Sequence, residues 1–148
     1  MSPQVRLAAK DERRHIEYMM GPYLAGFGAP PDFAYPNLDA YWNDTSRYPY
    51  IIAHGERFVG FALVHRVTNE PTFELVEFYV AAEFRRRGFG RAAAEALFML
   101  HLGAWSIAIR NDNPSGRAFW RPVLARYPVT MAEATQPPGV IYKFEAGK

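Results

Sequence analysis

The chain of 148 residues has no cysteine, which excludes disulfides, cysteine-ligated metal sites and a thiol nucleophile. Lysine is scarce as well and stands only at Lys10, Lys143 and Lys148. The formal net charge is only +2, a smaller basic excess than nucleic-acid-binding proteins normally carry. Most of the positive charge is arginine, whose planar guanidinium suits phosphate. We therefore expect an anionic small-molecule ligand and no nucleic-acid partner.

Two further features are missing: a long apolar run and a basic-then-apolar N-terminal segment. No apolar stretch approaches the roughly 20 residues that span a membrane, and no segment resembles a signal peptide. We therefore expect a cytoplasmic protein without a membrane partner. Hydrophobic residues, in contrast, make up 49% of the chain, which is enough to bury a substantial core. The length suits one domain over residues 1–148.

The spacing of apolar residues predicts the order of strands and helices. Strands are expected at 4–8, 50–53, 58–67, 72–80, 105–109, 129–132 and 140–144, and helices at 11–24, 37–44, 88–103 and 113–127. Pro22 should bend the first helix or end it early, and Pro122 should bend the last. The three strands between 50 and 80 form an antiparallel meander. The helix that follows them joins parallel strands. The fold class is therefore α/β (α+β) with a mixed sheet, in the order β-α-α-β-β-β-α-β-α-β-β.

A run of arginine and glycine connects the strand 72–80 to the next helix. It consists of Arg85, Arg86, Arg87, Gly88, Phe89, Gly90 and Arg91. The first turn of a helix carries unpaired backbone N–H groups and the positive end of the helix dipole. Glycines let the backbone turn tightly and approach an anion. The run therefore predicts a pyrophosphate site, although a solvated arginine run before a helix would have the same sequence.

Three segments of the chain carry motifs of one known family. Glu74–Val80 resembles the fourth strand of that family. Arg85-x-x-Gly88-x-Gly90 matches its Gln/Arg-x-x-Gly-x-Gly/Ala signature, and Asn113-x-x-Gly116-x-x-Phe119-Trp120 resembles its Asn-x-x-Ala-x-x-Phe/Leu-Tyr helix. The family is the GNAT superfamily of acyl-CoA N-acyltransferases, and the spacing and element order fit over nearly the whole chain. The chain also resembles a subgroup of bacterial predicted acetyltransferases without an assigned substrate.

The resemblance implies acetyl-CoA as the acyl donor, with no metal. It implies that the backbone of Tyr79 and Val80 pairs with the pantetheine arm where the fourth and fifth strands separate. It places Asn113 beside the pantetheine or the thioester. The implied donor-binding residues are Tyr79, Val80, Arg85, Arg86, Arg87, Gly88, Phe89, Gly90, Arg91, Asn113 and Trp120.

Trp120 departs from the family pattern, because the family often has tyrosine there as the general acid for the leaving thiolate. An indole N–H donates a hydrogen bond but does not titrate usefully. Another group or water would then protonate the thiolate, and Tyr79, Tyr127 and Tyr142 are candidates that the sequence does not rank. The alternative is a non-catalytic acyl-CoA-binding sensor module.

Glu77 is the candidate general base. An amine acceptor is mostly protonated at neutral pH, and a carboxylate near the thioester can remove its proton. Alternation along the strand predicts that Glu77 shares a face with Phe73, Leu75 and Tyr79, with Glu74 on the opposite face. An acid in such an apolar run is costly unless it has a partner. Several family members use a glutamate here; otherwise Glu77 would face solvent or pair with an arginine.

The acceptor pocket is implied to lie near residues 18–42 and 137–142. The first segment carries the aromatic residues Tyr23, Phe27, Phe33, Tyr35, Tyr41 and Trp42 and the acids Asp32, Asp39 and Asp44. Aromatic rings can hold an ammonium group through cation–π contact, but they can equally pack onto the core. We expect N-acetyl transfer to a primary amine on a small molecule or peptide. Family members often dimerise, so a homodimer is possible.

Overall fold

The computed structural model describes residues 2–85 and 88–147. Its strands are β1 (Gln4–Leu7), β2 (Arg47–His54), β3 (Arg57–Val67), β4 (Thr72–Val80), β5 (Gly103–Arg110), β6 (Thr130–Thr135) and β7 (Pro138–Ala146), and its α-helices are α1 (Arg13–Ala25), α2 (Ala40–Asn43), α3 (Phe89–Leu100) and α4 (Pro114–Leu124). This order confirms the predicted one, apart from two additional 3-10 turns at Lys10–Glu12 and Ala82–Phe84. None of the helices in the described part of the chain is long and apolar enough to cross a membrane.

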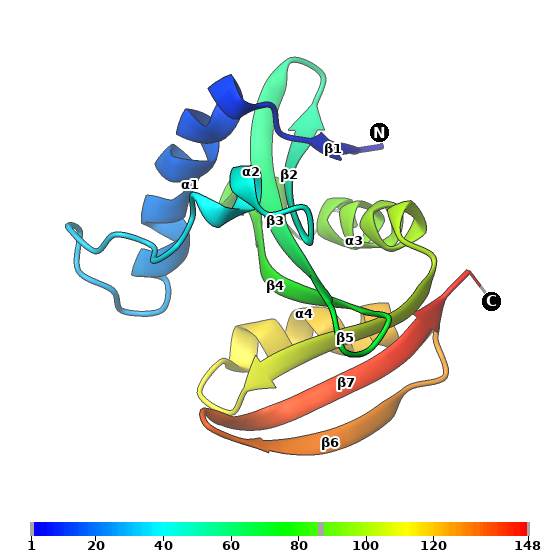
Figure 1. Ribbon diagram of the computed structural model, residues 1–148. Coiled ribbons are helices and arrows are strands. Elements are labelled where there is room, and N and C mark those ends of the chain that lie inside the picture. Colours follow the sequence, from blue (N-terminus) through cyan, green and yellow to red (C-terminus); the bar gives the residue numbers. More distant parts are fainter. Residues whose placement is uncertain (1, 86–87, 148) are drawn as a thin grey trace.

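All seven strands belong to one mixed sheet, in the order β1-β2-β3-β4-β5-β7-β6. The β2–β3–β4 meander is antiparallel, and β4 and β5 pair in parallel across the α3 connection, as predicted. The last strand, β7, lies between β5 and β6 and pairs antiparallel with both. Figure 1 shows the sheet running from β1 at the top to β6 at the bottom.

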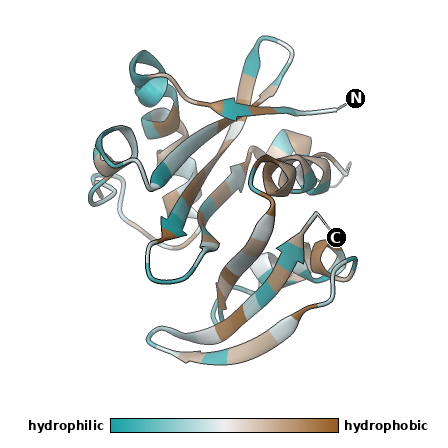
Figure 2. Cartoon of the chain, turned by 45° about the vertical axis from the view of Figure 1, so that its right-hand side comes forward, coloured by the Kyte–Doolittle hydropathy of each residue, from teal (hydrophilic) through white to brown (hydrophobic). Residues whose placement is uncertain are grey.

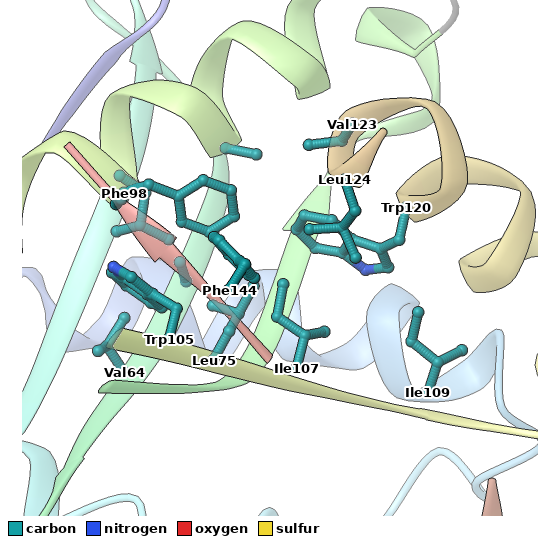
Figure 3. Close-up of a cluster of buried hydrophobic side chains, with 14 of the residues drawn as sticks. Val64, Leu75, Phe98, Trp105, Ile107, Ile109, Trp120, Val123, Leu124 and Phe144 are labelled. Carbon is teal, nitrogen blue, oxygen red and sulfur yellow. The ribbon is translucent and has the colours of Figure 1, made fainter. Parts of the chain in front are cut away.

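The helices cover opposite faces of the sheet (Figure 1). On one face, α1 and α2 pack on β2, β3 and β4 through an apolar cluster, here called the α1/α2 cluster, that includes Ile16, Met20, Tyr41, Phe61, Leu63 and Tyr79. On the other, α3 and α4 pack through the α3/α4 cluster, which includes Leu75, Phe98, Trp105, Ile107, Trp120 and Phe144 (Figure 3). Figure 2 shows hydrophobic residues along α3 and the central strands and hydrophilic ones at the β2–β3 turn.

Both helices that contain an internal proline continue through it. Helix α1 runs past Pro22 to Ala25, so the expectation that Pro22 ends the helix early is wrong. Helix α4 likewise passes Pro122 and ends at Leu124. Each proline lies in the last turn or near it, where the single hydrogen bond that proline removes costs least, because few later residues depend on it.

A β-bulge in β4 changes which side chains share a face. The register with β3 passes from Leu63↔Glu77 to Val64↔Leu75, so Val76 is an extra residue on β4. Leu75 belongs to the α3/α4 cluster, whereas Tyr79 belongs to the α1/α2 cluster. The prediction that Glu77 shares a face with Phe73 and Leu75 is therefore wrong, while its shared face with Tyr79 is confirmed. A bulge adds one residue and so reverses the alternation beyond it.

Glu74 is affected by the same reversal. It stands one residue before Leu75 and therefore faces the α1/α2 side, which is also the side that Glu77 faces beyond the bulge. The prediction that Glu74 and Glu77 point to opposite faces is wrong. Two carboxylates of β4 thus face the helices α1 and α2.

Candidate functional site

The strands β4 and β5 separate in the middle of the sheet. Their parallel pairing covers only Thr72–Leu75 on β4 and ends at Leu75↔Ile107. Beyond that point β4 continues to Val80 beside β3, and β5 continues to Arg110 beside β7. The bulge at Val76 coincides with the separation, which is consistent with the bend and extra twist that a bulge gives to its strand.

The backbone of β4 presents polar groups to this opening. The Ala81 N–H donates to the Val59 carbonyl at 2.8 Å. Because hydrogen-bonded and non-hydrogen-bonded pairs alternate in an antiparallel ladder, the N–H and C=O groups of Tyr79 face β3, and those of Phe78 and Val80 face the opening. Of the two residues expected to pair with pantetheine, Val80 therefore presents its backbone to the opening and Tyr79 does not.

Arg85 folds back onto the end of β4. Its Nε donates to the Val80 carbonyl at 2.7 Å, and its guanidinium lies 5.7 Å from the centroid of the Tyr79 ring. Arg85 thus occupies the Val80 carbonyl, which is one of the acceptors at the opening, and the Val80 N–H is the group of this residue left to pair with a ligand. Arg86 and Arg87, which belong to the predicted cradle, lie outside the described residues.

The N-terminus of α3 has the geometry expected of an anion site. Gly88 is its N-cap, with φ of 74° in the left-handed region, where glycine is favoured. The first helical hydrogen bond runs from the Ala92 N–H to the Gly88 carbonyl. The N–H groups of Phe89, Gly90 and Arg91 therefore have no acceptor within the helix, which is the arrangement that binds phosphate at a helix start.

The side chains of the cradle have separate structural roles. The ring of Phe89 is buried and packs 5.4 Å from that of Phe84. A Cβ added to Gly90 would lie 2.9 Å from Cε1 of Phe119 on α4. Gly90 is thus required for the approach of α3 to α4, a role that its place in the signature did not predict.

Asn113 caps α4. Its Oδ1 accepts from the Gly116 N–H at 3.0 Å and from the Ser115 hydroxyl at 3.2 Å. A Cβ on Gly116 would collide with the Asn113 side chain, so both motif residues are needed to build this helix start. Asn113 follows β5 at its separated end; a contact with pantetheine stays a prediction.

Trp120 is a core residue of the α3/α4 cluster. Its side chain is buried, with its ring centroid 5.2 Å from Phe78 and 4.7 Å from Phe119, and Figure 3 shows it packed above Ile107. Tyr127 packs 5.9 Å from Phe98, on the same side of the sheet. These contacts place Trp120 in the core and the half-buried Tyr127 against it.

Glu77 is held by two tyrosines from the N-terminal region. The Tyr23 hydroxyl donates to Oε1 at 2.6 Å and the Tyr35 hydroxyl donates to Oε2 at 2.7 Å. Glu77 is half-buried, and the alternative that it merely faces solvent is wrong. Burial raises the pKa of Tyr23 and of Tyr35, and the adjacent Glu77 carboxylate raises both further. The aromatic content of residues 18–42 was a signal for these residues, but nothing in the sequence paired them with Glu77.

Other groups complete the α1/α2 face around Glu77. Glu74 lies 3.9 Å from His65 Nδ1. Burial raises the pKa of Tyr41, and the charges of Glu77 and Glu74 contribute to the rise. The Tyr23 ring packs edge-on against Phe61 at 5.4 Å. A carboxylate lined by aromatic rings can hold an ammonium group.

The remaining acceptor-segment residues divide between core and surface. Tyr41 is buried, whereas Phe27 and Phe33 are exposed. Asp39 forms an ion pair with Arg13, and Asp44 accepts from the Ser46 N–H and hydroxyl and lies near Arg47. These two acids are therefore engaged within the chain. Residues 137–142 include the start of β7 at Pro138, where Gly139 lies opposite Arg110 at the end of β5.

Comparisons with known proteins bear on the family and the fold of the chain. The model of the Acetyltransferase (GNAT) family matches residues 14–123. An acetyltransferase from Thermus thermophilus has a TM-score of 0.76 at 16% identity, over 97% of this chain and 96% of that one. The PaiA N-acetyltransferase from Thermoplasma acidophilum, in complex with coenzyme A, has a TM-score of 0.68 at 11% identity, over 96% and 98%.

A third solved structure is the diaminobutyrate acetyltransferase from Paenibacillus lautus, in complex with L-2,4-diaminobutyric acid and coenzyme A. Its TM-score is 0.67 at 17% identity, over 98% of this chain and 95% of that one. At such identities the likeness shows the fold alone. No curated protein matches the chain in sequence. The family match covers most of the chain and the mixed sheet has the corresponding fold, so the chain belongs to the GNAT acetyltransferase family.

Proposed function

We propose that the protein transfers an acetyl group from acetyl-CoA to a primary amine, with Glu77 as the general base. The observation that carries this proposal is the Glu77 carboxylate, which two tyrosine hydroxyls hold at 2.6 and 2.7 Å on the part of β4 that has separated from β5. A carboxylate fixed at such an opening can take the proton of an attacking amine.

The donor site is supported by backbone groups. The N–H groups of Phe78 and Val80 face the opening, and those of Phe89, Gly90 and Arg91 are free of helical acceptors. The first set suits the amide-containing arm of coenzyme A, and the second suits its pyrophosphate. When bound, acetyl-CoA supplies the activated acetyl group; the chain binds it, orients it and moves the proton.

The amine class of acceptor is supported by the aromatic and acidic character of the α1/α2 face. Glu77 and Glu74 face the same side of β4, and the Tyr23 ring, whose hydroxyl binds Glu77, packs on Phe61. The diaminobutyrate acetyltransferase of the same fold binds a diamino acid, which makes small diamines and amino acids with a side-chain amine the first acceptors to test.

The first experiment is a calorimetric titration with acetyl-CoA and CoA. The variant Gly88→Ala should lose affinity, because alanine strains the left-handed φ of 74° that starts α3 by about 1–2 kcal/mol. The matched control is Gly55→Ala, which has φ of 61° in the β2–β3 turn and carries the same strain away from the opening. Absence of binding to the wild-type protein would overturn the proposed function.

The second experiment measures acetylation of an amine library. Glu77→Gln should lower kcat by roughly 10²–10⁴-fold, the usual contribution of a general base, while CoA affinity stays unchanged. Glu74→Gln is the matched control, because Glu74 faces the same side and contacts His65 instead of the tyrosines. Full turnover by Glu77→Gln would refute the base assignment. CoA binding without acetylation of any amine would favour a sensor module.

A further inference from the structure

A leaving thiolate needs a proton, and the core position of Trp120 leaves that role to another group. The hydroxyl of Tyr23 has the required contacts. It donates to Glu77 Oε1 at 2.6 Å, and the Tyr23 ring packs edge-on against that of Tyr79, with centroids 5.7 Å apart. Tyr79 in turn lies under the guanidinium of Arg85, which binds the Val80 carbonyl at the opening between β4 and β5.

Tyr35 makes the corresponding bond to the other carboxylate oxygen, at 2.7 Å, but in different surroundings. Burial and the Glu77 charge raise the pKa of Tyr35, the nearby Tyr41 raises it further, and Arg47 lowers it. Tyr41 belongs to α2 and Arg47 to the start of β2. Glu77 thus lies between two hydroxyls, and the ring that carries one of them, Tyr23, packs on Tyr79 at the end of β4 that borders the opening.

Resting on the acetyl transfer proposed above, we propose that Tyr23 is the proton donor to the leaving sulfur and that Glu77 and Tyr23 form a proton relay. The amine nitrogen bonds to the acetyl carbon as the carbon–sulfur bond breaks. Glu77 takes the proton from nitrogen, and the Tyr23 hydroxyl gives its proton to sulfur. The proton on Glu77 then returns to the Tyr23 oxygen, so that both residues are restored and one proton has moved from nitrogen to sulfur.

The relay couples the two proton transfers through charge. Burial raises the pKa of Tyr23, and the negative charge of Glu77 raises it further. Once Glu77 takes up the amine proton, that charge disappears, and the phenol becomes a better acid at the moment when sulfur needs a proton. Tyr79 is the candidate tyrosine nearest to Glu77 in the sequence. Its ring packs edge-on against the Tyr23 ring, with centroids 5.7 Å apart, so the contact between these two tyrosines is between their rings.

The test compares Tyr23→Phe with Tyr35→Phe, two isosteric changes that each remove one hydroxyl from Glu77. The pKa of bound CoA is followed through the ultraviolet absorbance of its thiolate, which requires no acceptor. A hydrogen bond to a charged group is worth about one pKa unit or more, so Tyr23→Phe should raise the pKa of the bound thiol by about that amount and Tyr35→Phe should leave it near the wild-type value. Equal values in the two variants would overturn the relay.

Turnover provides the second readout. With an amine that the wild-type protein acetylates, Tyr23→Phe should lower kcat by roughly 10²-fold with little change in the KM for acetyl-CoA, and Tyr35→Phe should lose much less. Equal losses would overturn the inference and leave the proposed acetyl transfer intact. A wild-type protein that binds CoA but acetylates no amine would overturn both.

Discussion

Gly90→Ala tests whether the second glycine of the signature serves helix packing. An added Cβ would lie 2.9 Å from Cε1 and 3.3 Å from Cζ of the Phe119 ring, so the ring must move. Phe119 is itself stacked on Phe78, with ring centroids 5.6 Å apart, and cannot yield freely. Overpacking of this kind costs about 1–3 kcal/mol, while alanine gains up to about 1 kcal/mol over glycine in helix propensity.

The balance is a net loss of about 1 kcal/mol of unfolding free energy for Gly90→Ala. In a Phe119→Ala background the obstacle is gone and only the propensity gain remains, so the same change should stabilise by about 0.5–1 kcal/mol. The coupling between the two positions is then about 2 kcal/mol, within the range for residues in contact.

Urea unfolding of the four proteins of this double-mutant cycle measures the coupling. Gly21→Ala is the matched control, because Gly21 lies in α1 with nothing within 4 Å of an added Cβ, and it should stabilise by up to about 1 kcal/mol. A coupling near zero, or destabilisation by Gly21→Ala of the same size, would refute the packing argument.

Two further predictions concern the core. Burial raises the pKa of Tyr50 to about 12. A group whose pKa is higher in the folded than in the unfolded protein contributes stability below its unfolded-state pKa, here about 10. That contribution is lost as the pH rises from about 10 toward 12. Unfolding free energies measured from pH 8 to 12 should fall above pH 10, and less so in Tyr50→Phe. Trp120→Tyr should destabilise by about 1–3 kcal/mol without raising kcat, because the side chain is buried beside Phe78; an increase in acetylation rate would contradict this core role.

The order of elements and the parallel β4–β5 pair could be predicted from the sequence. Both depend on the spacing of apolar residues along the sequence and on the geometry of a crossover helix, which are local properties. The strand at Thr72–Val80 was predicted with its observed bounds. The first helix was predicted over residues 11–24, and only the alternative that Pro22 ends it early failed, because one missing hydrogen bond near a helix end is outweighed by the burial of Ile16, Met19 and Met20.

The faces of β4 could not be predicted, because a bulge follows from backbone pairing with β3 and has no marker in the sequence around Val76. The partners of Glu77 were equally out of reach. Tyr23 stands 54 residues before Glu77 and Tyr35 stands 42 before it, so only the packing of α1 and its following loop on the sheet brings them together. The sequence could name Glu77 as the candidate base, but it could not give the environment of that side chain.

The extra residue in β4 makes the site depend on the length of the strand as well as on its composition. Deletion of Val76 would leave Glu77 and Tyr79 on their present face, since Leu75 and Glu77 would then simply alternate. It would also remove the local bend, and β4 could then run on beside β5 past Ile107. A relative that aligned with a one-residue gap here would keep its carboxylate and its tyrosines and lose the entrance for the donor.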